Sequence, residues 1–386
     1  MKESVNLFHV PGISVDAIPK ADGRVELKAK GIFKFIARPF LSIAGKHLAA
    51  EKCAKVTDTS VYPSAWLPPI PSPVFKRLIH DEIRTRYGKY SPETVSIEVT
   101  RQFNKNAEKY AKRKGTQTDT LTDPPVSQIK NAIDQAIKTG AVVITFTEGD
   151  PMLNENIVEY VRYIDKEKAV AMAYTWGLDF TPEKAQQLKE AGLQTLLVSI
   201  YSTDPSIHDS KREIQGAYEK AVEAIRIGLN AGLMVTMATH LDETRMDEME
   251  KLWELAKELG VHEFSIWESA PTLEGKQMMT DRDRKKINDF YRKINYSSDD
   301  GPRIFSNTIF EGEMFGTMAG RRWLHIATDG EVWPDPYIPL SYGNINEEPL
   351  KKIWKRMRKE PALRKKRKTH VLYDAKYLQK VKDANE

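Results

Sequence analysis

Cysteine is almost absent from this chain: its 386 residues include one, Cys53. A single thiol excludes an intrachain disulfide and a metal site built from several cysteines. Long apolar runs are missing as well, since no stretch reaches the roughly 18 apolar residues of a spanning helix. The first fifteen residues lack the basic-then-apolar pattern of a signal peptide. We therefore expect a cytoplasmic protein.

A strong overall charge is also lacking, because the net charge is only +5. The basic residues are uneven, however, and eleven of the eighteen residues in Lys351–Lys368 are Lys or Arg. Such a segment is typical either of an anionic partner, RNA or lipid headgroups, or of a solvated basic end. The segment Ile32–Ala54 is basic and amphipathic, with Pro39 interrupting it. It suggests either a peripheral membrane position with a lipid-like substrate, or a helix packed on the core or on a partner subunit.

Apolar residues make up 40% of the chain, enough for a sizeable core. The segment Tyr62–Phe75 holds five prolines among apolar residues. Proline removes backbone donors and blocks helix, so we expect an extended connector here. Trp66, Leu67, Ile70 and Val74 predict that this connector is strapped to a surface.

From about Thr94, β-rich runs alternate regularly with amphipathic helical runs. The predicted strands are Val95–Thr100, Ala141–Thr147, Ala169–Thr175, Thr195–Tyr201, Met234–His240 and Glu263–Ser269. The predicted helices between them are Ser127–Thr139, Asn154–Ile164, Pro182–Ala191, Ala217–Ala231 and Met246–Leu259. Six such alternations indicate a parallel sheet or a partial barrel.

The predicted strands end in polar or aromatic residues. Ligands of parallel α/β folds sit at the carboxyl ends of the strands, so a binding site is expected there. The residues at these ends are Glu148, Asp150, Thr175, Trp176, Tyr201, Ser202, His240, Trp267 and Glu268. Farther along, Asp329-Gly330 joins Arg322–Thr328 to Glu331–Tyr337, which predicts a hairpin.

Two segments carry a family resemblance. Val95–Ala111 resembles the first strand and cluster loop of the radical S-adenosylmethionine (SAM) enzymes, where three cysteines hold a [4Fe–4S] cluster. The matching positions here are Phe103, Ala107 and Tyr110. Thr145–Leu153, with Glu148, Gly149, Asp150 and Pro151, resembles the Gly-Gly-Glu-Pro turn that contacts the methionine amino group of SAM. The resemblance therefore implies a SAM site on a loop without its cluster ligands.

Two further segments extend the likeness. Val198–Asp209 resembles the strand that reaches the SAM ribose, and His240 and Glu268 fall where the family places adenine and substrate contacts. Met318–Ile345 resembles the extension that often binds an auxiliary cluster, but Thr317 and Asp335 stand at its cysteine positions. Carried over by this resemblance, the SAM-binding residues are expected to be Glu148, Gly149, Asp150, Thr175, Ser199 and Tyr201.

The resemblance implies an incomplete (β/α)6 TIM-like barrel. We expect an N-terminal strap in residues 1–93, the barrel in residues 94–300, an extension in residues 301–358 and a basic tail in residues 359–386.

Because iron–sulfur ligation needs thiolates, we expect SAM as cofactor without an iron–sulfur cluster. The function expected on this basis is polar group transfer, most simply methyl transfer, with His240 or Glu268 accepting a proton. Two alternatives stay open. One is a non-catalytic partner, regulator or substrate-binding module of an active radical SAM enzyme. The other is a mononuclear-metal enzyme with ligands among His208, Asp209, His240, Glu263 and Glu268.

Overall fold

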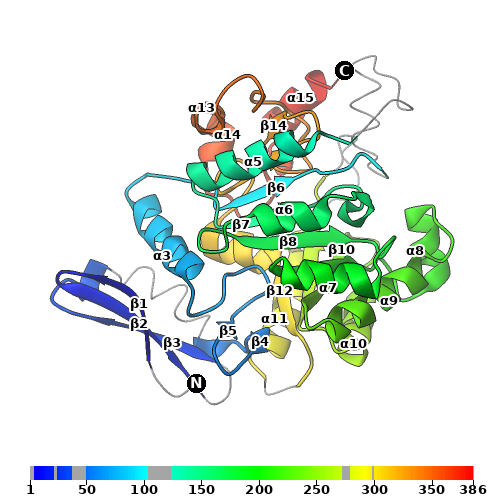
Figure 1. Ribbon diagram of the computed structural model, residues 1–386, viewed down its shortest axis with the longest axis horizontal. Helices are drawn as coiled ribbons and strands as arrows, with labels where there is room; N and C mark the ends of the chain where they lie inside the picture. Colours follow the sequence, from blue (N-terminus) through cyan, green and yellow to red (C-terminus); the bar gives the residue numbers. More distant parts are fainter. Residues whose placement is uncertain are drawn as a thin grey trace.

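A computed structural model describes residues 4–20, 24–36, 49–102, 123–271, 279–297 and 300–385. Nine of the described strands form one sheet, in the order β12-β11-β10-β9-β8-β7-β6-β13-β14 (Figure 1). Every neighbouring pair is parallel except the antiparallel pair β13–β14. The strands are β6 (Thr94–Ile97), β7 (Val143–Phe146), β8 (Val170–Thr175), β9 (Leu193–Ser199), β10 (Met234–Leu241), β11 (Glu263–Glu268), β12 (Arg303–Ser306), β13 (Trp323–Ile326) and β14 (Val332–Trp333).

Amphipathic helices connect the parallel strands and bury their apolar faces against the sheet. Local signals set their ends: the Thr181 hydroxyl accepts from Lys184 N at the start of α7, and Gly140 has a φ of 122° after α5. The helices are α5 (Val126–Thr139), α6 (Ile157–Tyr163), α7 (Pro182–Glu190), α8 (Pro205–Arg212), α9 (Ala217–Asn230), α10 (Glu248–Glu258) and α11 (Asp281–Asn295).

The predicted α/β fold is confirmed, and the six predicted strands all occur as parallel neighbours. Three strands, β12 at one edge and β13 with β14 at the other, were not predicted as part of it. β12 continues the sheet beyond β11, and β13 of the C-terminal hairpin pairs in parallel with β6, Trp323 opposite Thr94. The extension is therefore part of the central sheet. Among the described residues no pairing joins the two edges, so the sheet is open.

The connector between the N-terminal region and the sheet packs against side chains of the central strands. Trp66 is buried with Val143, Met172 and Trp267 from the strands. Its indole nitrogen donates to the Ser265 hydroxyl, at 3.3 Å. The expected strapping is thus present, but the connector ends earlier than predicted. Pro73 starts helix α3 (Pro73–Arg86), which the Ser72 hydroxyl caps by accepting from Phe75 N.

Within the first thirty residues, for which no elements were predicted, the described residues form a three-stranded antiparallel sheet. Its strands are β1 (Val5–Val10), β2 (Ile13–Pro19) and β3 (Val25–Lys30), followed by the 3-10 helix η1 (Lys34–Ile36) and the short pair β4 (Lys55–Val56) and β5 (Val61–Tyr62). Most of the predicted amphipathic segment Ile32–Ala54 lies outside the described residues.

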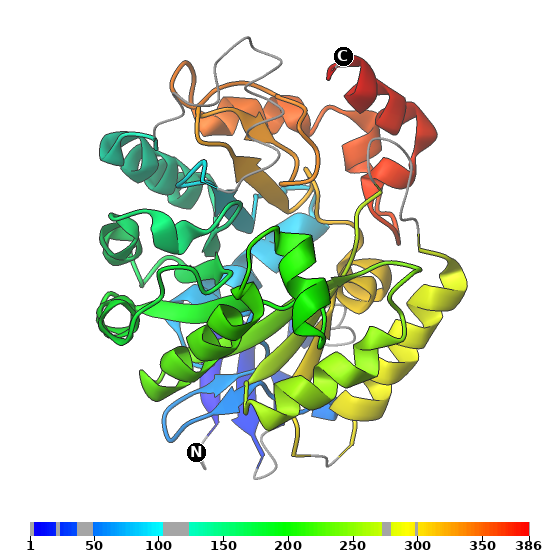
Figure 2. The same cartoon turned by 90° about the vertical axis from the view of Figure 1, so that its right-hand side faces the viewer.

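The C-terminal end is folded rather than a solvated tail. Its elements are α12 (Asn307–Ile309), the π-helix η5 (Phe310–Phe315), α13 (Leu350–Met357), α14 (Pro361–Arg364), η6 (Val371–Tyr373) and α15 (Ala375–Asp383). Leu363, Val371, Tyr377 and Val381 are buried. In both views the C-terminal helices (orange to red) and the N-terminal strands (blue) lie at opposite ends of the molecule (Figures 1 and 2). None of the helices in the described ranges is long and apolar enough to cross a bilayer.

Candidate functional site

The turn after β7 is held in an unusual conformation. Glu148 and Gly149 both have positive φ, 66° and 58°. A side chain at Gly149 would place its Cβ 2.3 Å from the carbonyl oxygen of Gln102, so only glycine fits. At Glu148, which has a Cβ, this conformation costs on the order of 1–3 kcal/mol. Such strain is typical of residues whose side chain must point in one set direction.

Asp150, the next residue, fastens this turn to the end of β8. Its carboxylate accepts hydrogen bonds from the Thr175 hydroxyl at 2.9 Å and from the backbone N–H groups of Met152, Trp176 and Leu178. Burial raises the pKa of Asp150, while these donors oppose the rise. Since its acceptor positions are used within the protein, Asp150 orders the site from behind rather than facing a ligand.

Glu148 has a different environment. It is half-buried and so keeps surface that water or a ligand can reach. Burial, together with the nearby carboxylates of Glu98 and Asp335, raises its pKa to about 8. A cation bound here would relieve the mutual repulsion of these carboxyl groups.

Two arginines face the same strand ends from the other side. The Arg212 guanidinium lies 4.4 Å from the centre of the Trp176 ring, and burial lowers its pKa to about 10. The Arg245 guanidinium lies 3.3 Å from the centre of the Tyr201 ring and donates to the carbonyl oxygen of His240 at 2.7 Å. Within the described residues, Arg212 Nε and Arg245 Nη2 are buried without a hydrogen-bond partner. Buried donors of this kind normally find an acceptor, so an anion fits here.

His240 and Tyr337 lie between the acidic and the basic side. His240 Nε2 is 2.7 Å from the Tyr337 hydroxyl. Burial lowers the pKa of His240 to about 4, and the positive charges of Arg212 and Arg245 lower it further. Burial likewise raises the pKa of Tyr337, with Glu148 adding to the rise. The imidazole is therefore neutral near pH 7 and can exchange hydrogen bonds, but it does not carry a charge.

The C-terminal extension contributes a second buried pair. His370 Nε2 lies 2.7 Å from an Asp335 carboxylate oxygen. Burial alone would lower the pKa of His370, but Asp335 and then Glu311 raise it on balance. Asp335 also accepts from the backbone N–H of Tyr337 at 2.9 Å, so this pair sets the position of Tyr337.

The remaining predicted site residues have mixed placements. The Glu268 carboxylate forms an ion pair with Arg284 at 2.6 Å and accepts a hydrogen bond from the Tyr373 hydroxyl at 2.7 Å. These partners occupy its oxygens. Ser199 is half-buried at the end of β9, and Tyr201 lies just beyond it. The positions Phe103, Ala107 and Tyr110 lie outside the described residues.

The structure gives no support to the predicted metal ligands. Among the described residues, no group of three His, Cys, Asp or Glu side chains is placed to hold a metal ion. Glu263 pairs with Arg303 at 2.9 Å, while Asp209 accepts from Gly216 N and Tyr218 N. His208 Nδ1 accepts from Tyr201 N.

Sequence reasoning missed the two arginines that make the site positively charged, and it missed Tyr337 and His370 of the C-terminal extension beside it. Arg212 lies three residues beyond the segment compared with the ribose-binding strand, and Arg245 follows the strand that ends near His240. For Arg245 its place soon after the end of β10 could have been the signal, whereas Arg212 lies too far from the end of β9 for such a signal. No signal in the sequence pointed to Tyr337 or His370, because their positions near the sheet depend on how the C-terminal extension folds.

Comparison with known proteins shows which family the chain resembles. A family model described as the Radical SAM superfamily matches residues 110–256. An AdoMet-dependent heme synthase of Methanosarcina barkeri is 26% identical over 289 residues, which cover 68% of this chain and 82% of that protein. An Fe-coproporphyrin III synthase of the same organism is 22% identical over 302 residues, covering 70% of this chain and 75% of that protein.

Solved structures agree on the fold. The crystal structure of Streptococcus suis SuiB bound to S-adenosylmethionine superposes with a TM-score of 0.54 at 12% identity, covering 72% of this chain and 70% of that one. At this identity the likeness concerns the fold alone.

These relatives correct the predicted function. Polar methyl transfer is wrong as a prediction, because the matched proteins are radical SAM enzymes named as synthases and not methyltransferases. A non-catalytic partner and a mononuclear-metal enzyme gain no support from them either. The predicted cofactor set of SAM without a cluster is contradicted in the same way, since the family implies an iron–sulfur cluster beside SAM.

The donors of this chain do not fit a thiolate-bound cluster. Such clusters are held by several cysteines, and Cys53 is the chain's one cysteine. Cys53 lines a cavity at the amino ends of the strands, where Thr94 and Val143 are the first residues of β6 and β7. Glu148 lies at the opposite, carboxyl ends.

Proposed function

We propose that this chain, which is similar to the Radical SAM superfamily over residues 110–256, binds S-adenosylmethionine at the carboxyl ends of its parallel strands. One observation carries the proposal. A half-buried carboxyl group, Glu148, and two guanidinium groups with unused donors, Arg212 and Arg245, face the same strand ends.

The charges of the ligand match this arrangement. The amino-acid end of SAM carries a carboxylate and an ammonium group, and its sulfur is a sulfonium. Arg212 is suited to the carboxylate, because a guanidinium offers paired donors in a rigid fork. Glu148 is suited to the ammonium group, because a bound cation favours its ionised form. His240 and Tyr337 lie between the two sides and can orient the ligand through hydrogen bonds.

The relatives suggest the class of the second substrate. The names of the heme and Fe-coproporphyrin III synthases point to an iron porphyrin or its precursor. The stack of Arg245 on Tyr201 supports this choice, because a flat aromatic face beside a cation suits a planar, carboxylate-bearing ring.

Isothermal titration of the purified protein with SAM tests the proposal. We expect binding by the wild type, and a loss of at least tenfold in affinity in Arg212→Gln, whose charged hydrogen bond is worth roughly 1.5–3 kcal/mol. Arg226→Gln, which removes an exposed arginine of α9, is the matched control and should bind as the wild type does. Absence of heat at millimolar SAM, or equal affinity in all three proteins, would refute the proposal.

The location of the protein and its contact with an anionic partner are proposals as well. A cytoplasmic position, with peripheral contact to a membrane, is supported by the low cysteine content and the basic C-terminal segment. Lys351, Lys352, Lys355 and Lys359 are exposed on or just after α13, so this face is suited to an anionic partner. Flotation with anionic liposomes and anisotropy with labelled RNA distinguish the two kinds of anion.

A further inference from the structure

A cavity lies at the amino ends of the strands, away from the proposed SAM site. The first residues of β6, β7 and β12, which are Thr94, Val143 and Arg303, all line it, as does Arg322 directly before β13. Its free volume is about 100 Å³. For comparison, an engineered cavity of roughly 150 Å³ with an apolar lining binds benzene. The cavity is therefore large enough for a small or narrow ligand.

The cavity exists because the sheet is open. β12 and β13 lie toward opposite ends of the strand order, and nothing pairs them among the described residues. The space between these edges is filled by side chains from non-strand segments, chiefly Trp66 of the connector and Phe310 and Phe315 of η5. Such segments do not interdigitate as regularly as strands, so a gap remains.

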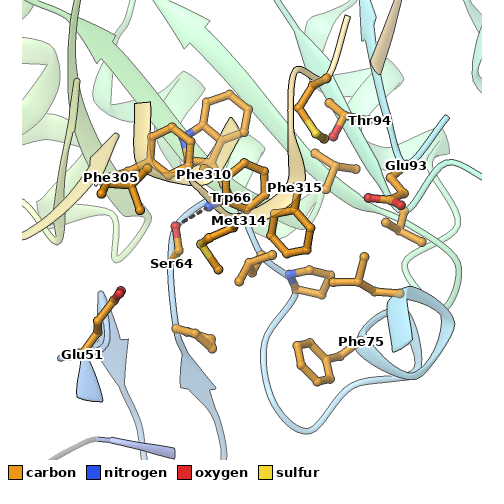
Figure 3. A pocket seen from close by; sticks show the side chains of 18 of the residues that line it. Glu51, Ser64, Trp66, Phe75, Glu93, Thr94, Phe305, Phe310, Met314 and Phe315 are labelled. Carbon is orange, nitrogen blue, oxygen red and sulfur yellow. Dashed lines mark hydrogen bonds between the residues drawn. The ribbon is translucent and has the colours of Figure 1, made fainter. Parts of the chain in front are cut away.

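Aromatic rings form a row along this gap. Trp66 and Phe305 have ring centres 5.6 Å apart, Phe305 and Phe310 5.6 Å, and Phe310 and Phe315 4.8 Å. The last two rings are held on a π-helix, an irregular form that occurs often at functional sites. Figure 3 shows these rings and Met314 between Glu51 on one side of the pocket and Glu93 on the other.

The charged groups around the cavity are paired with one another. On one side Arg303 binds Glu51 and Glu263 at 2.7 and 2.9 Å. On the other side Arg322 binds Glu93, at 2.8 Å, and Glu82. Each guanidinium is thus neutralised by two carboxylates, and a charged ligand would disturb these ion pairs. The Nε atoms of Arg303 and Arg322 are buried without a hydrogen-bond partner among the described residues, and the rest of the lining is mainly aromatic and aliphatic.

From these features we propose that the cavity binds an uncharged, narrow apolar chain, such as an alkyl or isoprenoid chain, between its two ion-pair clusters. The row of rings from Trp66 to Phe315 offers a chain a series of apolar contacts, which a compact ring would use only in part. Met314, with its flexible thioether side chain, can adjust the width of the path.

A chain-length series tests this site. Primary alcohols from butanol to dodecanol are titrated into the full-length protein, and binding is followed by calorimetry. Each added methylene should raise the affinity roughly fourfold while it is buried, and the gain should stop at the length that fills the cavity. Adsorption to exposed apolar surface would show no such limit.

Variants that fill the cavity give the second readout. Leu78→Phe on α3 and Met314→Phe on η5 add bulk from two different walls. Each should weaken the binding of the longest well-bound alcohol at least tenfold. Ile83→Phe is the matched control: it lies on the same helix, is also half-buried, and does not line the cavity. It should bind the alcohols like the wild type.

Either of two results would overturn the proposal. If the wild type shows no chain-length limit, or if both filling variants bind the alcohols as well as the wild type, the cavity is a packing gap and not a binding site. SAM binding is measured on the same samples and plays no part in this decision, so the two proposals can fail separately.

Discussion

Glu148 combines backbone strain with a raised pKa of about 8 at one position. At pH 7 only about a tenth of such a group is ionised. If the ionised form binds the ammonium group of SAM, affinity must rise with pH up to about 8, and above it the α-amino group of the ligand loses its own proton. Below that pH we expect the affinity to fall about tenfold for each unit.

Calorimetric titrations with SAM between pH 6 and 9 measure this dependence. His240, with a pKa near 4, and Arg212, with one near 10, do not titrate in this range. Glu148→Gln should bind SAM weakly, and its affinity should not rise with pH. Glu159→Gln, on the surface of α6, should keep the pH dependence of the wild type. A slope that persists in Glu148→Gln would assign the proton to another group.

Single residues of the site were predictable only where they follow a strand. Glu148, Tyr201 and His240 lie at the predicted strand ends, because the alternating pattern located the parallel strands. Their roles as ligands stay predictions. Arg212 was not foreseen, since its position depends on the short helix α8 bringing its last residue back over Trp176.

The connector from β5 to α3 acts as an element of the core although it has almost no regular structure. Trp66 contacts Trp267 and Phe305, with ring centres 5.1 and 5.6 Å away, and donates to Ser265. We expect Trp66→Ala to lower the free energy of unfolding by roughly 3–5 kcal/mol, because it leaves a large cavity.

Urea denaturation followed by circular dichroism measures this loss. Leu67→Ala, at the half-buried neighbouring position, is the control and should cost clearly less. Equal losses in the two variants would show that the connector is held by its whole length and not by its tryptophan.

Other elements escaped prediction for a shared reason. β12 is four residues long and begins with Arg303, which reads as surface. Arg303 is buried there because Glu51 and Glu263 neutralise it from distant parts of the chain. The strands β1 to β3 likewise depend on each other for their hydrogen bonds. The helices between the predicted strands were found because their periodic apolar faces are local signals, whereas α11 was not predicted despite the capping box at Thr280.

At the scale of the whole molecule, one of the buried contacts that hold the C-terminal end is His370 with Asp335, which lies two residues after β14 of the central sheet. The side chain of Asp335 is 2% exposed and that of His370 14%. The segment with His370 was predicted as a basic tail, since its charges dominate the sequence. Its buried residues Val371 and Leu372 are few and become visible only once they pack.

This contact predicts how stability depends on pH. The pKa of His370 is higher in the folded protein than in the unfolded chain, so its protonated form favours folding. Its contribution is fully present below the ordinary histidine pKa of about 6.5 and is lost as the pH rises through the raised value. The free energy of unfolding should therefore fall across this window in the wild type, and the fall should be smaller in His370→Gln.

Removing the histidine also leaves Asp335 buried without its partner, which we expect to cost roughly 3 kcal/mol at pH 6. Adding Asp335→Asn to His370→Gln should recover part of that cost, since the unpaired charge is then gone. His80→Gln, at an exposed histidine of α3, is the control for the general effect of losing an imidazole. Urea unfolding at several pH values measures all four proteins. If His370→Gln keeps the slope of the wild type, the ion pair of His370 with Asp335 does not contribute to the docking of the C-terminal end, and its other contacts hold it.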